Sequence, residues 1–133
     1  MLKGITTGEV KMPERVIFRR GDIVKITLPG KLKKGANPLA ALVVSSDWYN
    51  DYREDVITLE IRCTNLGPER DDYELDTKDL RFGKLPEHSL VKLGKVMTVP
   101  KRFVAKTERR LPDETVRKII QKFSREILAE LVV

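Results

Sequence analysis

Four short apolar runs follow one another in the first half of the chain without a helix-length segment between them. They are rich in β-branched residues and bounded by Gly, Pro, Asn and Asp, as is typical of β-strands. The runs are Val16–Phe18, Ile23–Leu28, Ala40–Val44 and Val56–Cys63. Parallel strands need a long crossover, usually a helix. The spacing therefore predicts a mainly antiparallel sheet, closed or nearly closed.

The last of these runs alternates cleanly between apolar and polar residues, which is the period of a half-buried strand. One face carries Ile57, Leu59, Ile61 and Cys63, and the other carries Thr58, Glu60, Arg62 and Thr64. We expect the apolar face to pack into the core. The polar face is then available to a ligand.

The second half of the chain predicts two more strands and one amphipathic helix. The strands are expected at Tyr73–Leu75 and across Ser89–Val99. Apolar residues then recur at spacings of three and four, which indicates a helix over about 112–131. These are Val116, Ile119, Ile120, Phe123, Ile127 and Leu131. Pro112 opens the segment, and acidic residues in its first turn complement the helix dipole.

The length of 133 residues suits a single domain, which we place at 15–133 behind an extended arm at 1–14. The net charge of +6 favours polyanions, because each phosphate neutralised by Lys or Arg releases counterions. Nucleic acid therefore ranks ahead of an acidic small molecule.

Neither disulfides nor metals are expected from the composition. Cys63 is the single cysteine and His88 the single histidine, so no cluster offers metal-ligand spacing. The sequence predicts no cofactor. It also lacks a signal-peptide core and a membrane-length apolar run, so we expect a cytoplasmic protein.

Several segments together resemble the PemK/MazF toxin family over about residues 19–128. Those segments are Gly21–Val24, Ala41–Ser45, Cys63–Thr64, Leu90–Val99 and Leu111–Glu114. The resemblance implies a mainly β fold, a small antiparallel SH3-like β-barrel of the PemK/MazF/CcdB type with a C-terminal helix. It further implies metal-independent cleavage of single-stranded RNA, a homodimer, and neutralisation by a small acidic antitoxin.

The same resemblance makes Thr64 the first catalytic candidate, since the family usually ends this strand in a Ser or Thr at the active site. The alternative for Thr64 is a strand end that caps the Leu66–Gly67 turn. The family also presents an Arg-Pro pair in the loop before the second strand, where this chain has Asn37–Pro38. Arg62 lies on the Thr64 face about 7 Å away, and is the natural substitute for the missing arginine.

Further candidates complete the predicted site. Lys33, Lys34 and Asn37 in the basic loop, and Lys92 and Lys95 on the later strand, are expected to bind RNA. Glu60 is the first candidate for the base that deprotonates the 2′-hydroxyl, ahead of His88 and Glu87. Three simpler alternatives stay open: Arg62 as an ion-pair partner of Glu60 or another carboxylate, Lys92 and Lys95 as protection of an edge strand, and His88 as a solvated turn residue.

An aromatic cluster follows the second strand and contains Trp48, Tyr49 and Tyr52. Such rings stack unpaired bases when cations lie beside them, although they more often belong to a core or a dimer interface. The sequence thus predicts a toxin-like endoribonuclease that leaves a 2′,3′-cyclic phosphate. The alternatives are a nucleic-acid-binding barrel that has lost catalysis and a purely structural interaction domain.

Overall fold

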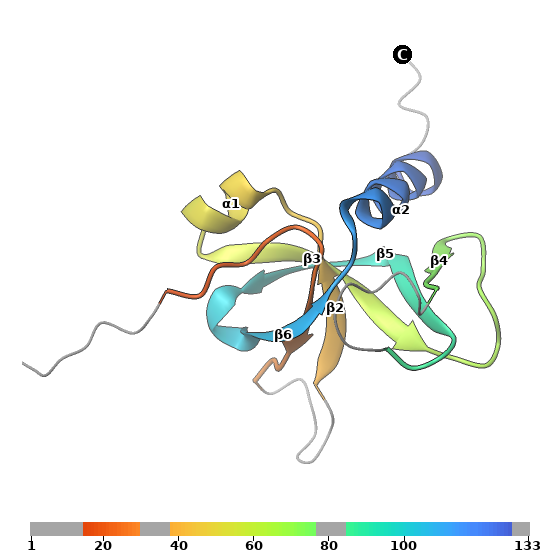
Figure 1. Cartoon of the computed structure of the whole chain (residues 1–133), viewed down its shortest axis with the longest axis horizontal. Coiled ribbons are helices and arrows are strands. Elements are labelled where there is room, and N and C mark those ends of the chain that lie inside the picture. Colours follow the sequence, from red (N-terminus) through yellow and green to blue (C-terminus); the bar gives the residue numbers. More distant parts are fainter. Residues whose placement is uncertain (1–14, 30–37, 77–84, 129–133) are drawn as a thin grey trace, which may run out of the picture.

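A computed structural model describes residues 15–29, 38–76 and 85–128 of the chain. Six strands form one sheet in the order β4-β5-β3-β2-β1-β6, and every pairing is antiparallel. Figure 1 shows α2 lying over one side of this curved sheet. The elements are β1 (Asp22–Ile26), β2 (Leu39–Val43), α1 (Asp47–Tyr52), β3 (Asp55–Cys63), β4 (Asp72–Glu74), β5 (Ser89–Pro100), η2 (Lys101–Phe103), β6 (Val104–Arg110) and α2 (Asp113–Glu126).

The predicted architecture, mainly antiparallel β with a C-terminal helix, is confirmed. The sheet is open rather than closed, because β4 and β6 form its two edges and do not pair in the described part of the chain. With three residues, β4 offers too short a ladder to complete a barrel. The arm at 1–14 and the predicted RNA-binding residues Lys33, Lys34 and Asn37 lie outside the described residues.

Three elements were not predicted, namely α1, η2 and β6, and one predicted strand is absent. Val16–Phe18 is not a strand; Phe18 is instead buried in the core while its two neighbours stay exposed. The helix α1 fills the stretch that carries the aromatic cluster, and β6 pairs with β1. The polar composition of β6 hides it from a hydrophobic pattern, because its ladder is made by the backbone. The helix α2 ends at Glu126, and residues 129–131 of the predicted helix lie outside the described ranges.

Both faces of β3 are largely buried over residues 56–61, because a core cluster covers each face. One core cluster includes Leu59 and Ile61 together with Val116 and Ile119 of α2. A second cluster packs Val56 against residues of β1, β2 and β5. The expectation of an accessible polar face was therefore wrong for Thr58 and Glu60, which are both buried.

The β3–β5 ladder contains a register shift in the second half of β3. Leu59 is paired with Val96, whereas the next residue, Glu60, is paired with Lys92. The intervening residues of β5, including Gly94 and Lys95, have no partner in this ladder. Such bulges bend a strand and redirect its side chains. Lys95 is exposed as a result.

Candidate nucleic-acid interface

Near the carboxyl end of β3, two of the predicted catalytic residues, Arg62 and Glu60, form an ion pair. The Arg62 Nε donates a hydrogen bond to Glu60, whose side chain is only 10% exposed, whereas that of Arg62 is 55% exposed. This hydrogen bond and the adjacent carboxylate charge raise the pKa of Arg62 above its ordinary value. The guanidinium thus stays charged, is held close to the strand, and faces solvent.

Thr64 follows β3 and is half buried. Its Oγ1 accepts a hydrogen bond from the Leu66 backbone N–H at 3.1 Å, which is the turn-capping contact anticipated for this residue. Because that bond uses a lone pair of the hydroxyl oxygen, the hydroxyl hydrogen can still donate to another group. Capping and a contact with a phosphate are therefore compatible.

The turn before β5 is brought against the end of β3. The Thr64 backbone N–H donates to the His88 carbonyl at 3.3 Å, and the Cys63 thiol donates to the Glu87 carbonyl at 3.0 Å. His88 has a φ of 63°, a left-handed conformation uncommon for a residue other than glycine. A pocket of about 520 Å³ opens beside this turn, with Glu74, Asp76, Glu87 and His88 in its lining. The backbone of the two secondary acid/base candidates, Glu87 and His88, thus lies against the end of β3, 23 and 24 residues from Thr64 in sequence.

The two predicted RNA-binding lysines of β5 differ in their surroundings. The Lys92 Nζ lies 2.7 Å from Asp72 Oδ1, and the two side chains are 19% and 1% exposed. Burial alone would raise the pKa of Asp72, but a hydrogen bond from the Glu69 N–H and the ammonium of Lys92 outweigh it and lower that pKa. The ammonium of Lys92 is therefore used in an ion pair within the fold, whereas Lys95 is exposed.

Three carboxylates near β4 come within 4.8 Å of one another, namely those of Glu69, Asp71 and Asp72. A group of this kind can hold a divalent cation. Here the ammonium of Lys92 already lies against Asp72, so an ion pair neutralises the most buried member. The arrangement is that of a salt bridge in the fold.

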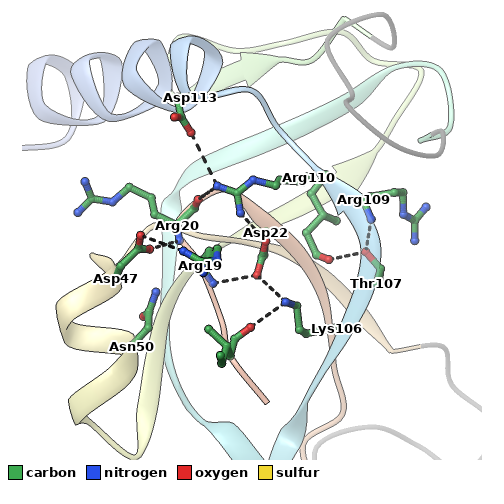
Figure 2. A network of polar contacts seen from close by, with 12 residues as sticks. Arg19, Arg20, Asp22, Asp47, Asn50, Lys106, Thr107, Arg109, Arg110 and Asp113 are labelled. Carbon is green, nitrogen blue, oxygen red and sulfur yellow. Dashed lines mark hydrogen bonds and ion pairs between the residues drawn. The ribbon is translucent and has the colours of Figure 1, made fainter. Parts of the chain in front are cut away.

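A larger polar network, which the sequence interpretation missed, lies at the start of β1 and joins it to the end of β6. Figure 2 shows Asp22 at its centre, with Arg19, Lys106 and Arg110 around the carboxylate. Asp22 accepts hydrogen bonds from the Arg19 N–H at 2.8 Å and from Arg110 Nη1 at 2.9 Å, and Lys106 Nζ lies 3.5 Å away. The one signal in the sequence was the repetition of paired arginines: Arg19–Arg20 lie just before β1, and Arg109–Arg110 end β6, which pairs with β1.

The helix α1 joins this network through its first residue. Asp47 accepts a hydrogen bond from the Arg20 N–H at 2.9 Å and lies 3.9 Å from Arg19 Nη1. Ser46 caps the helix by accepting from the Tyr49 N–H at 3.1 Å, and Tyr49 donates its hydroxyl to Asp55 at 2.6 Å. That hydrogen bond to a carboxylate raises the pKa of Tyr49. The helix is thus held at both its N-terminus and its middle.

Comparison with known proteins places the chain among toxins. The family described as PemK-like, MazF-like toxin of type II toxin-antitoxin system matches residues 19–127. A search of curated protein sequences gave no match.

Solved structures give the same fold at low identity. An endoribonuclease from a mycobacterial species, in complex with its cognate antitoxin, is 17% identical with a TM-score of 0.65, covering 84% of this chain and 96% of its own. Another mycobacterial endoribonuclease is 16% identical with a TM-score of 0.64, covering 82% and 89%. MazF from Deinococcus radiodurans is 13% identical with a TM-score of 0.62, covering 83% and 96%.

Proposed function

The chain belongs to the PemK-like, MazF-like toxin family of type II toxin-antitoxin systems, and from this premise we propose that it is an endoribonuclease that cleaves single-stranded RNA without a metal ion. The observation that carries the proposal is the exposed Arg62, held by Glu60 beside the capped Thr64 at one end of β3. Arginine suits this position because its planar fork of donors matches phosphate oxygens.

Each group has a chemical role in the proposed reaction. Attack of the 2′-hydroxyl oxygen on the adjacent phosphorus forms a 2′,3′-cyclic phosphate and expels the 5′-oxygen. Arg62 would stabilise the charge that gathers on the phosphate oxygens, which is usually the largest catalytic contribution. Thr64 would donate its hydroxyl hydrogen to one of those oxygens.

Two proton transfers remain, one from the 2′-hydroxyl and one to the leaving 5′-oxygen. Glu60 is the proposed base, because its carboxylate lies directly against the Arg62 guanidinium that would contact the phosphate. His88 is the proposed acid, since its turn is hydrogen-bonded to Thr64 and an imidazole is a common proton donor in catalysis. Lys95, together with Lys33, Lys34 and Asn37, would guide the RNA backbone, with Lys92 supporting this surface through Asp72.

The proposal extends to partners and location. We infer that the protein forms a homodimer, acts in the cytoplasm and is neutralised by a small acidic antitoxin, in keeping with the family and with the net charge of +6. In the parts of the chain that the structure describes, no helix has the length and apolar character needed to cross a membrane.

A second function, RNA binding without cleavage, is favoured by a specific observation. Each of three candidate groups already has a partner in the fold: Arg62 has Glu60, Thr64 has Leu66, and Lys92 has Asp72. The loop position at which the family normally presents an arginine is Asn37. A barrel that has lost catalysis would retain these contacts for stability alone.

Mapping of RNA ends in excess EDTA separates the two functions. Purified protein is incubated with long single-stranded RNA, beside Thr64→Ala and Arg62→Ala. We expect discrete cuts with cyclic phosphate ends, reduced about a hundredfold in Arg62→Ala, because loss of one strong electrostatic donor costs roughly 3 kcal/mol of transition-state stabilisation. Arg125→Ala removes an exposed arginine near the end of α2 and serves as the matched control.

The outcomes are distinct. Cuts that persist unchanged in both variants would refute the assigned site. RNA that is bound but left intact by the wild-type protein would refute the enzyme and leave the binding barrel.

A further inference from the structure

Two aromatic side chains stand on the outer face of α1 without a place in either core. Trp48 and Tyr52 are 59% and 71% exposed, and their ring centroids lie 5.9 Å apart. The Arg53 guanidinium lies over the Trp48 ring at 5.5 Å from its centroid. Large exposed rings are costly to leave in water and mark interaction sites when they cluster. Their exposure excludes the core interpretation for Trp48 and Tyr52.

The platform formed by these rings is held rigidly by the residues beneath it. Asn50 is buried, and its side-chain amide donates to the Ser45 carbonyl at 3.0 Å. Tyr49 is fixed to Asp55, and Ser46 caps the helix. The residues of α1 that face inward are thus bound to the sheet. Only the outward-facing rings are left for a ligand.

Basic pockets flank α1 on two sides. A pocket of about 570 Å³ contains Asp47 in its lining, together with Arg19, Arg20, Arg110 and Arg117. A second pocket of about 400 Å³ contains Asp51, together with Arg15, Arg53, Lys101 and Arg102. Counting Asp113 and Glu54 as well, eight basic side chains face four acidic ones across the two pockets. The linings of the two pockets therefore carry more positive than negative side chains.

We propose that α1 and its two flanking pockets form an accessory binding surface for single-stranded RNA, in which Trp48 and Tyr52 stack on bases and the arginines contact phosphates. Stacking rings inside a positive groove are how proteins hold unpaired strands without reading their sequence. In an RNA strand, phosphates flank each nucleotide on both sides, so cationic pockets on both sides of the two rings suit an RNA whose bases stack on them. This inference rests on the proposed function and extends it to a longer substrate.

The accessory surface is separate from the proposed catalytic end. The helix α1 precedes β3, and Thr64 follows it, so the nine residues of the strand place the two ends about 30 Å apart. In Figure 1, α1 and β4 lie at opposite ends of the molecule. The surface would therefore contact RNA that flanks the cleaved bond, and add affinity for long strands alone.

The chain offers a direct probe of this contact, because Trp48 is its single tryptophan. We would titrate the full-length protein with an uncleavable 2′-O-methyl oligonucleotide of about 20 nucleotides and follow intrinsic fluorescence. We expect strong quenching as bases stack on Trp48. Anisotropy with the same labelled strand would show about tenfold weaker binding in Trp48→Leu, which keeps the bulk but removes the ring face. A five-nucleotide strand should bind both proteins equally.

Charge variants test the pockets. Arg19→Ala with Arg117→Ala removes two exposed cations of the larger pocket, and should make the slope of log affinity against log salt shallower by about 1.4. Lys118→Ala is the matched control, since it removes an exposed cation from the neighbouring position of the same helix. The control should leave the slope near that of the wild type.

The measurements distinguish RNA from other ligands of this surface. Unquenched Trp48 and unchanged affinity in Trp48→Leu, while RNA is still cut, would overturn the accessory surface and leave the enzyme intact. Quenching without any cleavage would support the surface and refute the enzyme. Saturable binding of poly-glutamate in place of RNA, or loss of the dimer in Trp48→Leu by light scattering, would overturn the proposal in favour of an acidic peptide or a second copy.

Discussion

Replacement of Asp22 by asparagine tests whether the arginine network around this buried carboxylate holds the sheet together. Asp22 is 5% exposed and joins the start of β1 to β6 through Arg110, with Lys106 close by. Asparagine keeps the shape of aspartate, but only one of its two terminal atoms, the amide oxygen, can accept a hydrogen bond. Its NH₂ group would then face one of the two N–H donors that Asp22 now binds. Loss of one charge-assisted hydrogen bond and weakening of a second gives a cost of about 3 kcal/mol.

The measurement is urea unfolding, analysed for the midpoint and the slope, with thermal melting as a second readout. For a chain of this length, 3 kcal/mol corresponds to a melting temperature lower by about 10 °C. The matched control is Asp113→Asn, because Asp113 also pairs with Arg110, at 3.8 Å, but is 85% exposed. That change should cost below about 1 kcal/mol, including its effect on the helix dipole.

Asp22 is buried and Asp113 is exposed, so the two variants should differ clearly in the free energy of unfolding that they lose. Unfolding free energies of the two variants within about 1 kcal/mol of each other would show that water screens Asp22 as well, and would refute the argument. A double-mutant cycle with Arg110→Met adds a second check. The coupling between Asp22 and Arg110 should exceed about 1 kcal/mol if the pair is desolvated.

Two further predictions concern stability elsewhere in the sheet. Asp72→Asn should lower the free energy of unfolding most at pH 7 and least near pH 2. The folded state lowers the pKa of Asp72 from 3.8, so the stabilising contribution of its carboxylate is present above that value and disappears as the pH falls through the folded pKa. Equal losses at both pH values in urea titrations would contradict this. Gly21→Ala should lower the free energy of unfolding by about 3 kcal/mol, and Gly67→Ala by about 1 kcal/mol. Both glycines have positive φ, but an added Cβ at Gly21 would lie 3.2 Å from Val116, whereas nothing lies within 4 Å at Gly67. Equal losses in the same assay would refute the steric argument.

Local patterns in the sequence predicted most of the strands and the helix α2. Apolar residues at spacings of three and four gave the buried face of α2, where Val116 and Ile119 now lie in the core. The alternation of apolar and polar residues identified β3 itself. Thr64 caps the turn after this strand, which is the structural role that the sequence analysis gave as its alternative. The pairing of Arg62 with Glu60, two residues apart, was likewise within reach of the sequence. These features depend on residues close together in the chain.

The surroundings of the candidate site residues depend on strands far apart in the chain. Glu60 was expected on an open face, yet it is buried because β3 is a central strand covered on both sides. Lys92 was expected to meet RNA, yet it is held by Asp72 from β4. Neither outcome follows from the alternation of a single strand, since alternation assigns side chains to two faces but does not say what covers each face.

The sequence by itself determined the toxin family, the order of the main strands and the amphipathic helix, because periodicity and turn residues act over a few positions. Only the tertiary structure decided which charges are available. It brought Arg19 and Arg110 from opposite ends of the chain onto one carboxylate, set Trp48 and Tyr52 outward on a helix fixed from below, and placed His88 beside Thr64. The physical reason is that an ion pair or a binding surface depends on distance in space, which antiparallel pairing sets without any local signal.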